Sequence, residues 1–188
     1  MHCWLLRHGC TARDTIVSCG EETAQPHNVG SGTLLANEPI VIDVFPQDEK
    51  TGYYADMSRT FVKGEPSPEI QDIYGTVRDG QTLAEEMLRP GVTGAVVHNA
   101  VLDFFTERGY TTETEGFIHS LGHGVGLQIH EGPSLSPRAD TQLMAGHVVT
   151  VEPGLYYRNT GGVRLEDLGV ITKDGFVCYT KYRRRLIV

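Results

Sequence analysis

The sequence predicts an α+β fold built on a curved antiparallel sheet. Three features of its 188 residues favour this fold: strand-like segments come first, two helical segments occupy the middle, and glycine-punctuated strand-like segments fill the rest. Strands and helices that are segregated along a chain favour α+β over an alternating, doubly wound fold. No fixed-period repeat or low-complexity segment divides the sequence. We therefore expect a single domain spanning residues 1–188.

The first third of the chain predicts a β-hairpin that brings two aspartates together. Runs rich in β-branched residues and bounded by Gly, Asn or Pro occur at Thr15–Cys19, Pro39–Phe45 and Gly52–Val62. The polar stretch Pro46–Thr51 separates the last two runs and lets them pair across a turn. Asp43 and Asp56 should then lie close to each other.

Two helices should follow the hairpin. Ser67 is a good N-cap and Pro68 suits the first helical position, so a helix should run from here to about Leu88. Thr93 caps a second helix that should end near Arg108. Short apolar segments then predict strands around Ile118, Val148–Val151, Val163–Leu165, Val170–Ile171 and Phe176–Cys178.

The composition limits the partners and the compartment. Sixteen Lys and Arg against 24 Asp and Glu give a net charge of −8, which argues against nucleic acid and suits cation binding. No apolar stretch approaches the roughly 18 residues of a membrane span, so we expect no membrane partner and a cytoplasmic protein. The four cysteines include no CxxC pair and are expected to be reduced and mostly buried.

The segment Gly116–Glu131 concentrates three histidines, His119, His123 and His130, among glycines. These glycines let the backbone approach a ligand or another strand closely. The glycines do not complete a dinucleotide-binding fingerprint, because no helix follows them. Pro133 excludes the zinc-binding helix that His130 and Glu131 would otherwise begin. Each histidine taken alone would be an ordinary surface or core residue, but three together indicate a site.

Four carboxylates occur at apolar, strand-like segments elsewhere in the chain, namely Asp43, Asp56, Glu152 and Glu166. Clustered around one imidazole they would repel one another, because like charges at close range raise each other's pKa. A pair of divalent cations removes that repulsion. An oxygen-rich site of this kind suits Mn²⁺, Co²⁺, Fe²⁺ or Zn²⁺.

These residues and their surroundings resemble a known family. The ordered set Asp43, Asp56, His123, Glu152 and Glu166, with the motifs GHGVGLQIHEGP, VEPGLYY and GVRLEDLGVIT, is similar to the pita-bread metallopeptidases. These include methionine aminopeptidase, Xaa-Pro aminopeptidase and prolidase. The segments 152–156 and 162–167 resemble the Xaa-Pro aminopeptidase and prolidase branch. The resemblance spans roughly Thr15 to Ile187 and implies a pita-bread fold, with residues 1–188 expected to form one metallopeptidase catalytic domain.

The resemblance also implies a role for each residue. Asp43 would bind one metal ion, His123 and Glu152 the other, and Asp56 and Glu166 would bridge the two. His27 and His119 would position the substrate, and His130 would hold the scissile carbonyl. Glu152 would take the proton of the attacking water and pass it on. The catalytic set would thus be His27, His130 and Glu152, while Arg59 and Arg164 would orient the bridging acids. The ions are expected to be Mn²⁺ or Co²⁺, with Zn²⁺ or Fe²⁺ as alternatives.

The function implied is a two-metal exopeptidase that hydrolyses Xaa-Pro bonds in a peptide substrate, as an aminopeptidase or a dipeptidase. Methionine aminopeptidase, a creatinase-like hydrolase and a non-catalytic pita-bread binding module are the alternatives. A homodimer is a possible assembly. Family domains begin with two helices before the first strand, whereas at most fourteen residues precede Thr15 here. We therefore expect the N-terminal helices to be missing and the chain to be truncated at that end.

Overall fold

Two antiparallel sheets form the framework of the fold. The computed structural model describes residues 1–188. One sheet has three strands in the order β2-β3-β5, which span Ile16–Cys19, Pro39–Val44 and Met57–Val62. The other has five strands in the order β12-β11-β8-β6-β7, which span Gly175–Cys178, Asp167–Thr172, Val148–Val151, Gly122–Gly124 and Glu131–Leu135. Two short ribbons complete the strands: β9 (Gly154–Tyr157) with β10 (Gly161–Arg164), and β1 (Cys10–Thr11) with β4 (Gln47–Asp48).

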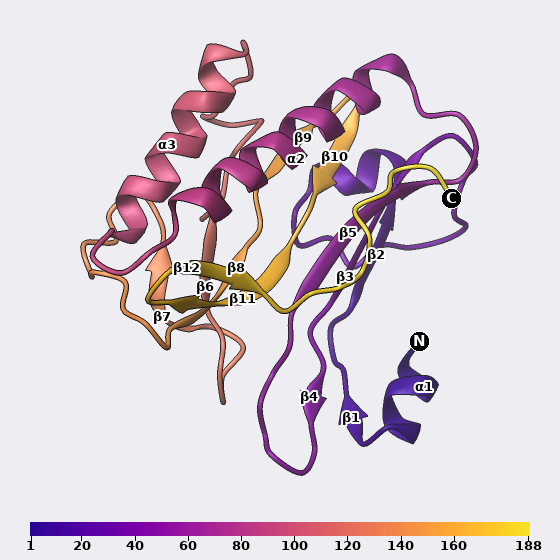
Figure 1. Cartoon of the computed structure of the whole chain (residues 1–188). Helices are drawn as coiled ribbons and strands as arrows, with labels where there is room; N and C mark the ends of the chain where they lie inside the picture. Colours follow the sequence, from indigo (N-terminus) through magenta and orange to yellow (C-terminus); the bar gives the residue numbers. More distant parts are fainter.

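The expected hairpin is present, but its second strand is shorter than predicted. β3 and β5 are antiparallel, with Asp43 opposite Ser58. The strand begins at Met57 and not at Gly52, because the connecting arm forms other contacts: β4 pairs with β1, and the amide of Tyr54 donates to the carbonyl of Gly126. Asp56 consequently lies directly before β5. Figure 1 shows this arm extending away from the sheets.

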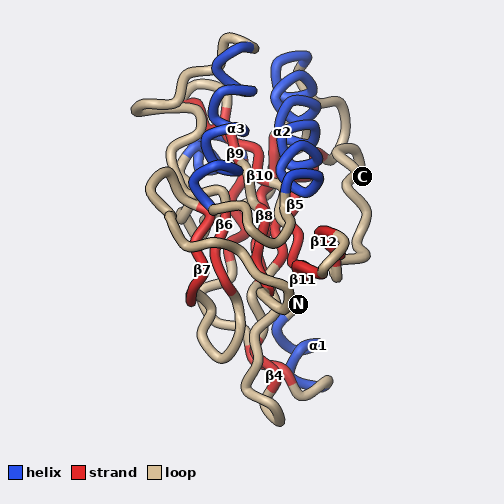
Figure 2. Tube along the Cα trace, turned by 60° about the vertical axis from the view of Figure 1, so that its left-hand side comes forward, coloured by secondary structure: helices blue, strands red, loops and turns tan.

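Both predicted helices form with the expected caps. α2 spans Pro68–Met87, and the Ser67 hydroxyl accepts a hydrogen bond from the amide of Ile70. α3 spans Gly94–Glu107, and the Thr93 hydroxyl accepts one from the amide of Val96. The two helices lie side by side on one side of the strands (Figures 1 and 2). A cluster of 20 buried hydrophobic residues fills the space between these helices and the strands.

Several elements differ from the sequence prediction. The strand expected around Ile118 is absent, and only an isolated bridge joins Gly116 to Tyr156. The glycine-rich β6 was not predicted, and neither were β7, β9, the short helix α1 (His2–Arg7) or the 3₁₀ helix η1 (Gly20–Ala24). The expectation of mostly buried cysteines is wrong, because Cys19 alone is buried. No helix combines the length and the apolar character needed to cross a bilayer.

Candidate metal centre

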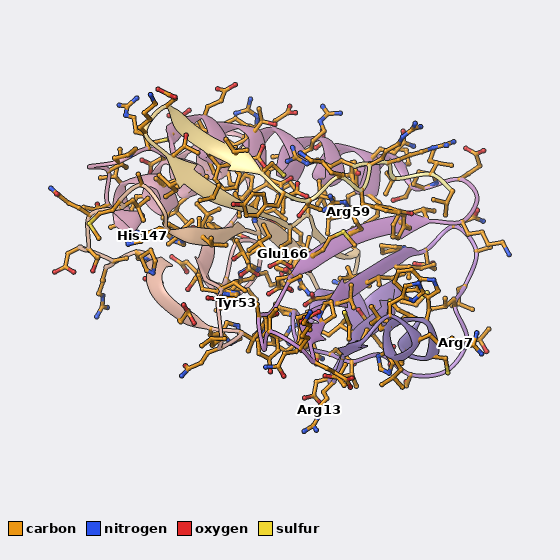
Figure 3. All side chains as sticks on the ribbon, turned by 60° about the horizontal axis from the view of Figure 1, so that its bottom comes forward. Arg7, Arg13, Tyr53, Arg59, His147 and Glu166 are labelled. Atoms are coloured by element: carbon orange, nitrogen blue, oxygen red, sulfur yellow. The ribbon has the colours of Figure 1, made fainter.

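The five residues expected to bind metal come from both sheets and meet at one cavity. Their positions follow the strand ends: Asp43 is near the end of β3, Asp56 precedes β5, and His123 is the middle residue of β6. Glu152 directly follows β8, and Glu166 lies between β10 and β11. The cavity has a volume of about 240 Å³. Its lining includes these five residues together with His27, His119, His130 and Arg164. Glu166 is labelled near the middle of the molecule in Figure 3.

The ligand-type atoms at the centre of this cavity are close together. Asp56, His123 and Glu166 each offer one such atom within 4.8 Å of the others. The Nε2 atom of His123 lies 3.2 Å from a carboxylate oxygen of Glu152 and 3.8 Å from one of Asp56. One imidazole therefore contacts acids that the sequence places far apart.

Burial and mutual repulsion shift the pKa values of three of these acids upward. Burial, followed by the charges of Asp43 and Glu152, raises the pKa of Asp56 to about 8. Burial and the charges of Asp56, Glu152 and Asp43 raise the pKa of Glu166 well above its ordinary value. Burial also raises the pKa of Asp43, against the opposing charge of Arg164. The chain alone supplies too little positive charge to keep all these carboxyls ionised.

Glu152 differs from the other acids. Burial alone would raise its pKa, but the hydrogen bond with His123 and the charges of His119, His123 and Arg164 lower it below the ordinary value. The hydroxyl of Thr150 also donates to a Glu152 oxygen, over 3.3 Å. Glu152 is consequently an ionised group at neutral pH that can accept a proton.

The imidazole of His123 is oriented as a ligand. Its Nδ1 lies 3.1 Å from the carbonyl oxygen of Gly124, which can only accept, so Nδ1 carries a proton that it donates. Nε2 faces the acids and donates its own proton to Glu152 in the metal-free chain, and loss of that proton would leave the lone pair of a metal-binding histidine. Burial lowers the pKa of His123, but the contact with Glu152 and the charge of Asp56 outweigh it and raise that pKa overall.

The residues fit a divalent cation on three grounds. Oxygen-rich donors with one imidazole are ligands that such ions accept. The Oδ1 atom of Asp43 is buried and has no hydrogen-bond partner within the protein. The raised pKa values of Asp56 and Glu166 show that ionisation of the set requires added positive charge. Asp43, Asp56, His123, Glu152 and Glu166 could therefore hold the metal.

Three further histidines surround the acids. His119 Nε2 lies 2.9 Å from the hydroxyl of Tyr156, and its Nδ1 lies 2.8 Å from the carbonyl oxygen of Ser120. The ring of His130 packs edge-on against His123, with centroids 4.2 Å apart. Burial and the neighbouring His123 lower the pKa of His130, so this imidazole is neutral at pH 7. His27 lies on the cavity wall.

The two arginines contact this site in different ways. Arg164 binds the Asp43 carboxylate at 2.9 Å and the hydroxyls of Ser58 and Tyr156 at 2.9 and 3.1 Å. Arg59 instead donates to the backbone carbonyls of Ser58 and Glu166 and pairs with the Asp167 carboxylate. Arg164 therefore reaches the expected bridging acid Glu166 through Ser58, and Arg59 reaches it through its backbone carbonyl. Neither arginine forms a hydrogen bond with Asp56, the other expected bridging acid.

Sequence reasoning missed three polar residues that contact the site, namely Ser58, Thr150 and Tyr156. Ser58 donates to a Glu166 oxygen over 2.8 Å, and Thr150 accepts a hydrogen bond from the amide of His123. Ser58 and Thr150 each lie two residues from a predicted ligand. Because side chains at i and i+2 share a face of a strand, that spacing is the signal that could have found them.

The glycines around His123 allow the neighbouring strands to approach closely, as the sequence predicted. A Cβ atom on Gly122 would collide with the backbone of Thr150, and one on Gly124 with the backbone of Gly132. β6 therefore lies too close to β7 and β8 for side chains at these two positions. The close approach of the backbone expected from this segment is confirmed.

Comparison with known proteins shows the family of the chain. Residues 1–173 match metallopeptidase family M24, and the chain belongs to this family. It is 39% identical over 179 residues to a protein named Xaa-Pro dipeptidase from Lactobacillus delbrueckii subsp. lactis, covering 95% of this chain and 47% of that one. The chain spans about half the length of the curated relatives that it matches.

Solved structures show the same fold. The Xaa-Pro dipeptidase from Bacillus anthracis superposes with a TM-score of 0.93 at 37% identity, covering 100% of this chain and 52% of that one. The X-Pro aminopeptidase from Thermotoga maritima gives a TM-score of 0.87 at 38% identity, with 94% and 49% covered. The expected pita-bread α+β fold is confirmed.

Proposed function

We propose that this chain carries the catalytic centre of a metal-dependent exopeptidase that hydrolyses Xaa-Pro bonds. The observation that supports this most directly is the convergence of five potential ligands and three histidines on one cavity. The names of its relatives, Xaa-Pro dipeptidase and X-Pro aminopeptidase, support the same substrate class. The single catalytic domain over residues 1–188, the homodimer and the cytoplasmic location stay predictions.

Two divalent ions, Mn²⁺ or Co²⁺ first, would be held by Asp43 on one side, by His123 and Glu152 on the other, and by Asp56 and Glu166 in common. When bound, such ions lower the pKa of a water and so supply a nucleophile at neutral pH. The arrangement of the acids supports this assignment, because Asp56 lies within reach of both His123 and Glu166.

The side chains themselves would orient the peptide and move the proton. Glu152 is ionised, so it can accept the proton of the attacking water and pass it to the leaving nitrogen. Neutral His130 can donate a hydrogen bond to the carbonyl oxygen as negative charge develops there, a contact that strengthens in the transition state. His119 and His27 would position the substrate along the cavity wall.

The state of His119 follows from its two partners. Because Nδ1 must donate to the Ser120 carbonyl, Nε2 is left as an acceptor for the Tyr156 hydroxyl. Burial lowers the pKa of His119 and thereby favours this neutral form. His119 would thus present the substrate with the face of a fixed, neutral ring.

A side-by-side assay tests the proposal. Xaa-Pro dipeptides, Xaa-Pro tripeptides and Met-Ala-Ser are incubated with the chain and either Mn²⁺ or Co²⁺. We expect metal-dependent release of the residue before proline, and cleavage of the dipeptide or the tripeptide distinguishes dipeptidase from aminopeptidase action. Cleavage of Met-Ala-Ser alone would contradict the substrate class. Metal retained after dialysis without hydrolysis would contradict catalysis by this chain.

A further inference from the structure

A fully buried glutamine on helix α2 contacts the backbone beside the metal centre. Gln81 is 0% exposed and lies among apolar residues of the helix face that packs on the strands. Burying an amide is costly unless it forms hydrogen bonds. Its Nε2 atom donates to the carbonyl oxygen of Val151 over 2.9 Å and to that of Leu165 over 3.2 Å. Its Oε1 atom is buried without a partner.

The two carbonyls belong to the residues directly before two of the acids. Val151 is the last residue of β8 and precedes Glu152, while Leu165 lies between β10 and β11 and precedes Glu166. Asp167 pairs with Val151 at the end of the β8–β11 ladder. The amide of Gln81 therefore joins the two segments just where this ladder stops. Since carbonyls only accept hydrogen bonds, the nitrogen of the amide must face both of them.

The hydrogen bonds of Gln81 lie at a gap between two strand ladders. The β8–β11 ladder ends at Val151 and Asp167, and the β9–β10 ribbon pairs Gly154 with Arg164. Glu152 and Glu166 lie in the short interval between these two ladders, where a backbone hydrogen bond from Leu165 to Pro153 also joins the segments. An amide that binds both backbones limits their separation without adding charge to the cavity.

We propose that Gln81 is a positioning residue that sets the distance between the Glu152 and Glu166 carboxylates, and this inference rests on the proposed metal centre. It acts through the backbone and touches neither metal nor substrate. Removing a residue that holds metal ligands in place without touching the metal commonly weakens metal affinity by about 10- to 100-fold.

The test compares Gln81→Met with a matched control, Val77→Ala. Methionine keeps an unbranched chain of similar length but removes both donors. Val77 lies one turn earlier on the same buried face, is also 0% exposed, and has no polar group. We expect Gln81→Met to bind Co²⁺ about 10- to 100-fold more weakly than Val77→Ala in a titration. The shorter amide of Gln81→Asn provides a second variant if methionine prevents folding, and it should also weaken binding because it cannot reach both carbonyls.

Amide hydrogen exchange in the metal-free chain gives a readout that does not depend on activity. The amide of Glu152 donates to the carbonyl of Leu121 and that of Glu166 to the carbonyl of Ser58. Both amides should exchange faster in Gln81→Met or Gln81→Asn, but not selectively in Val77→Ala. Exchange and Co²⁺ affinity that match Val77→Ala would overturn the inference. If the unmodified chain binds no Co²⁺, the proposed function fails, while the exchange comparison still decides the role of Gln81.

Discussion

Glu166 and Asp167 are consecutive acids in two different electrostatic surroundings. Glu166 faces the cavity that it shares with Asp56 and Asp43, and no arginine contacts its carboxylate. Asp167 faces the other way, where it binds the buried guanidinium of Arg59 and that of Arg184. Neighbouring residues along an extended chain point to opposite faces, so one backbone segment serves both clusters.

Both clusters group potential metal ligands. Glu85, Asp167 and Cys178 also place ligand atoms within 4.8 Å of one another. Arg184 lies between two of them and binds both Glu85 and Asp167, so the protein itself supplies the compensating cations there. The difference shows that a group of acids indicates a metal only where the chain provides too few positive charges of its own.

The largest effect should follow from removing an acid at the cavity. We expect Asp56→Ala or Glu166→Ala to abolish hydrolysis of Xaa-Pro peptides, because each removes a carboxylate proposed to bind both ions. Metal content and turnover of the purified variants check this. Full activity in either folded variant would contradict the two-metal centre.

In the metal-free chain, Asp56→Asn should leave the unfolding free energy unchanged or raise it, since the substitution relieves the repulsion between Asp56 and the neighbouring carboxylates.

Asp167→Asn should lower the free energy of unfolding, in contrast to Asp56→Asn. Arg59 is 1% exposed, and Asp167→Asn would leave its charge buried with a weaker partner. We expect a loss of about 3–5 kcal/mol in the free energy of unfolding, measured with denaturant. Asp79→Asn is the matched control, because its pair with Arg78 is half exposed and should contribute at most about 1 kcal/mol. Equal effects in the two variants would contradict this contrast.

His130→Ala should separate chemistry from metal binding within the cavity. We expect kcat to fall by about 10²-fold while metal stoichiometry stays unchanged, in line with the loss of one hydrogen-bond donor to a developing oxyanion. Steady-state kinetics and metal analysis of the same sample test this. An unchanged kcat, or loss of bound metal, would show that the role belongs to another residue.

The smallest effect on stability is expected from His98, a buried histidine that forms a hydrogen bond inside the core. Burial, followed by the charge of His119, lowers the pKa of His98 to about 4, and its Nδ1 accepts the amide proton of Leu121. The unfolded chain, with a pKa near 6.5, therefore binds this proton first as the pH falls. Stability should be lost between pH 6.5 and 4, by roughly 2–3 kcal/mol from this group.

The measurement for His98 is a difference between two chains. The unfolding free energies of the wild type and of His98→Gln, which keeps an acceptor for Leu121, are compared at pH 7 and pH 4.5. The wild type should lose more stability than the variant over this interval. Parallel losses would mean that the carboxylates alone cause the acid sensitivity.

The rules for helix caps and turns predicted the elements that depend on residues near in sequence. Ser67 and Thr93 cap α2 and α3 as expected, and the polar turn after β3 returns the chain to form β5. The rules failed for β6, whose sequence Gly-His-Gly has little strand propensity. Its strand form depends on β7 and β8 on either side, and the sequence predicts β8 but neither β7 nor the pairing of β6 with these strands.

The candidate site likewise contains residues that the sequence predicts and residues that it does not. The ordered acids and His123 could be chosen from the sequence through their motifs and the family resemblance, and the structure places them at one cavity. Gln81 and Tyr156 could not be chosen in this way. Gln81 looks like any helix residue until its carbonyl partners are known, and the Tyr156 hydroxyl acquires its role only where His119 and Arg164 meet.

The distribution of the ligands along the chain has a consequence for synthesis on the ribosome. The set begins at position 43 and ends at position 166, and its members come from two sheets. A nascent chain cannot assemble the metal centre until residue 166 has emerged, because contacts between distant residues form late. Metal capture would therefore follow the meeting of the two sheets, and a chain stalled before residue 166 would leave the acids without their full ligand set.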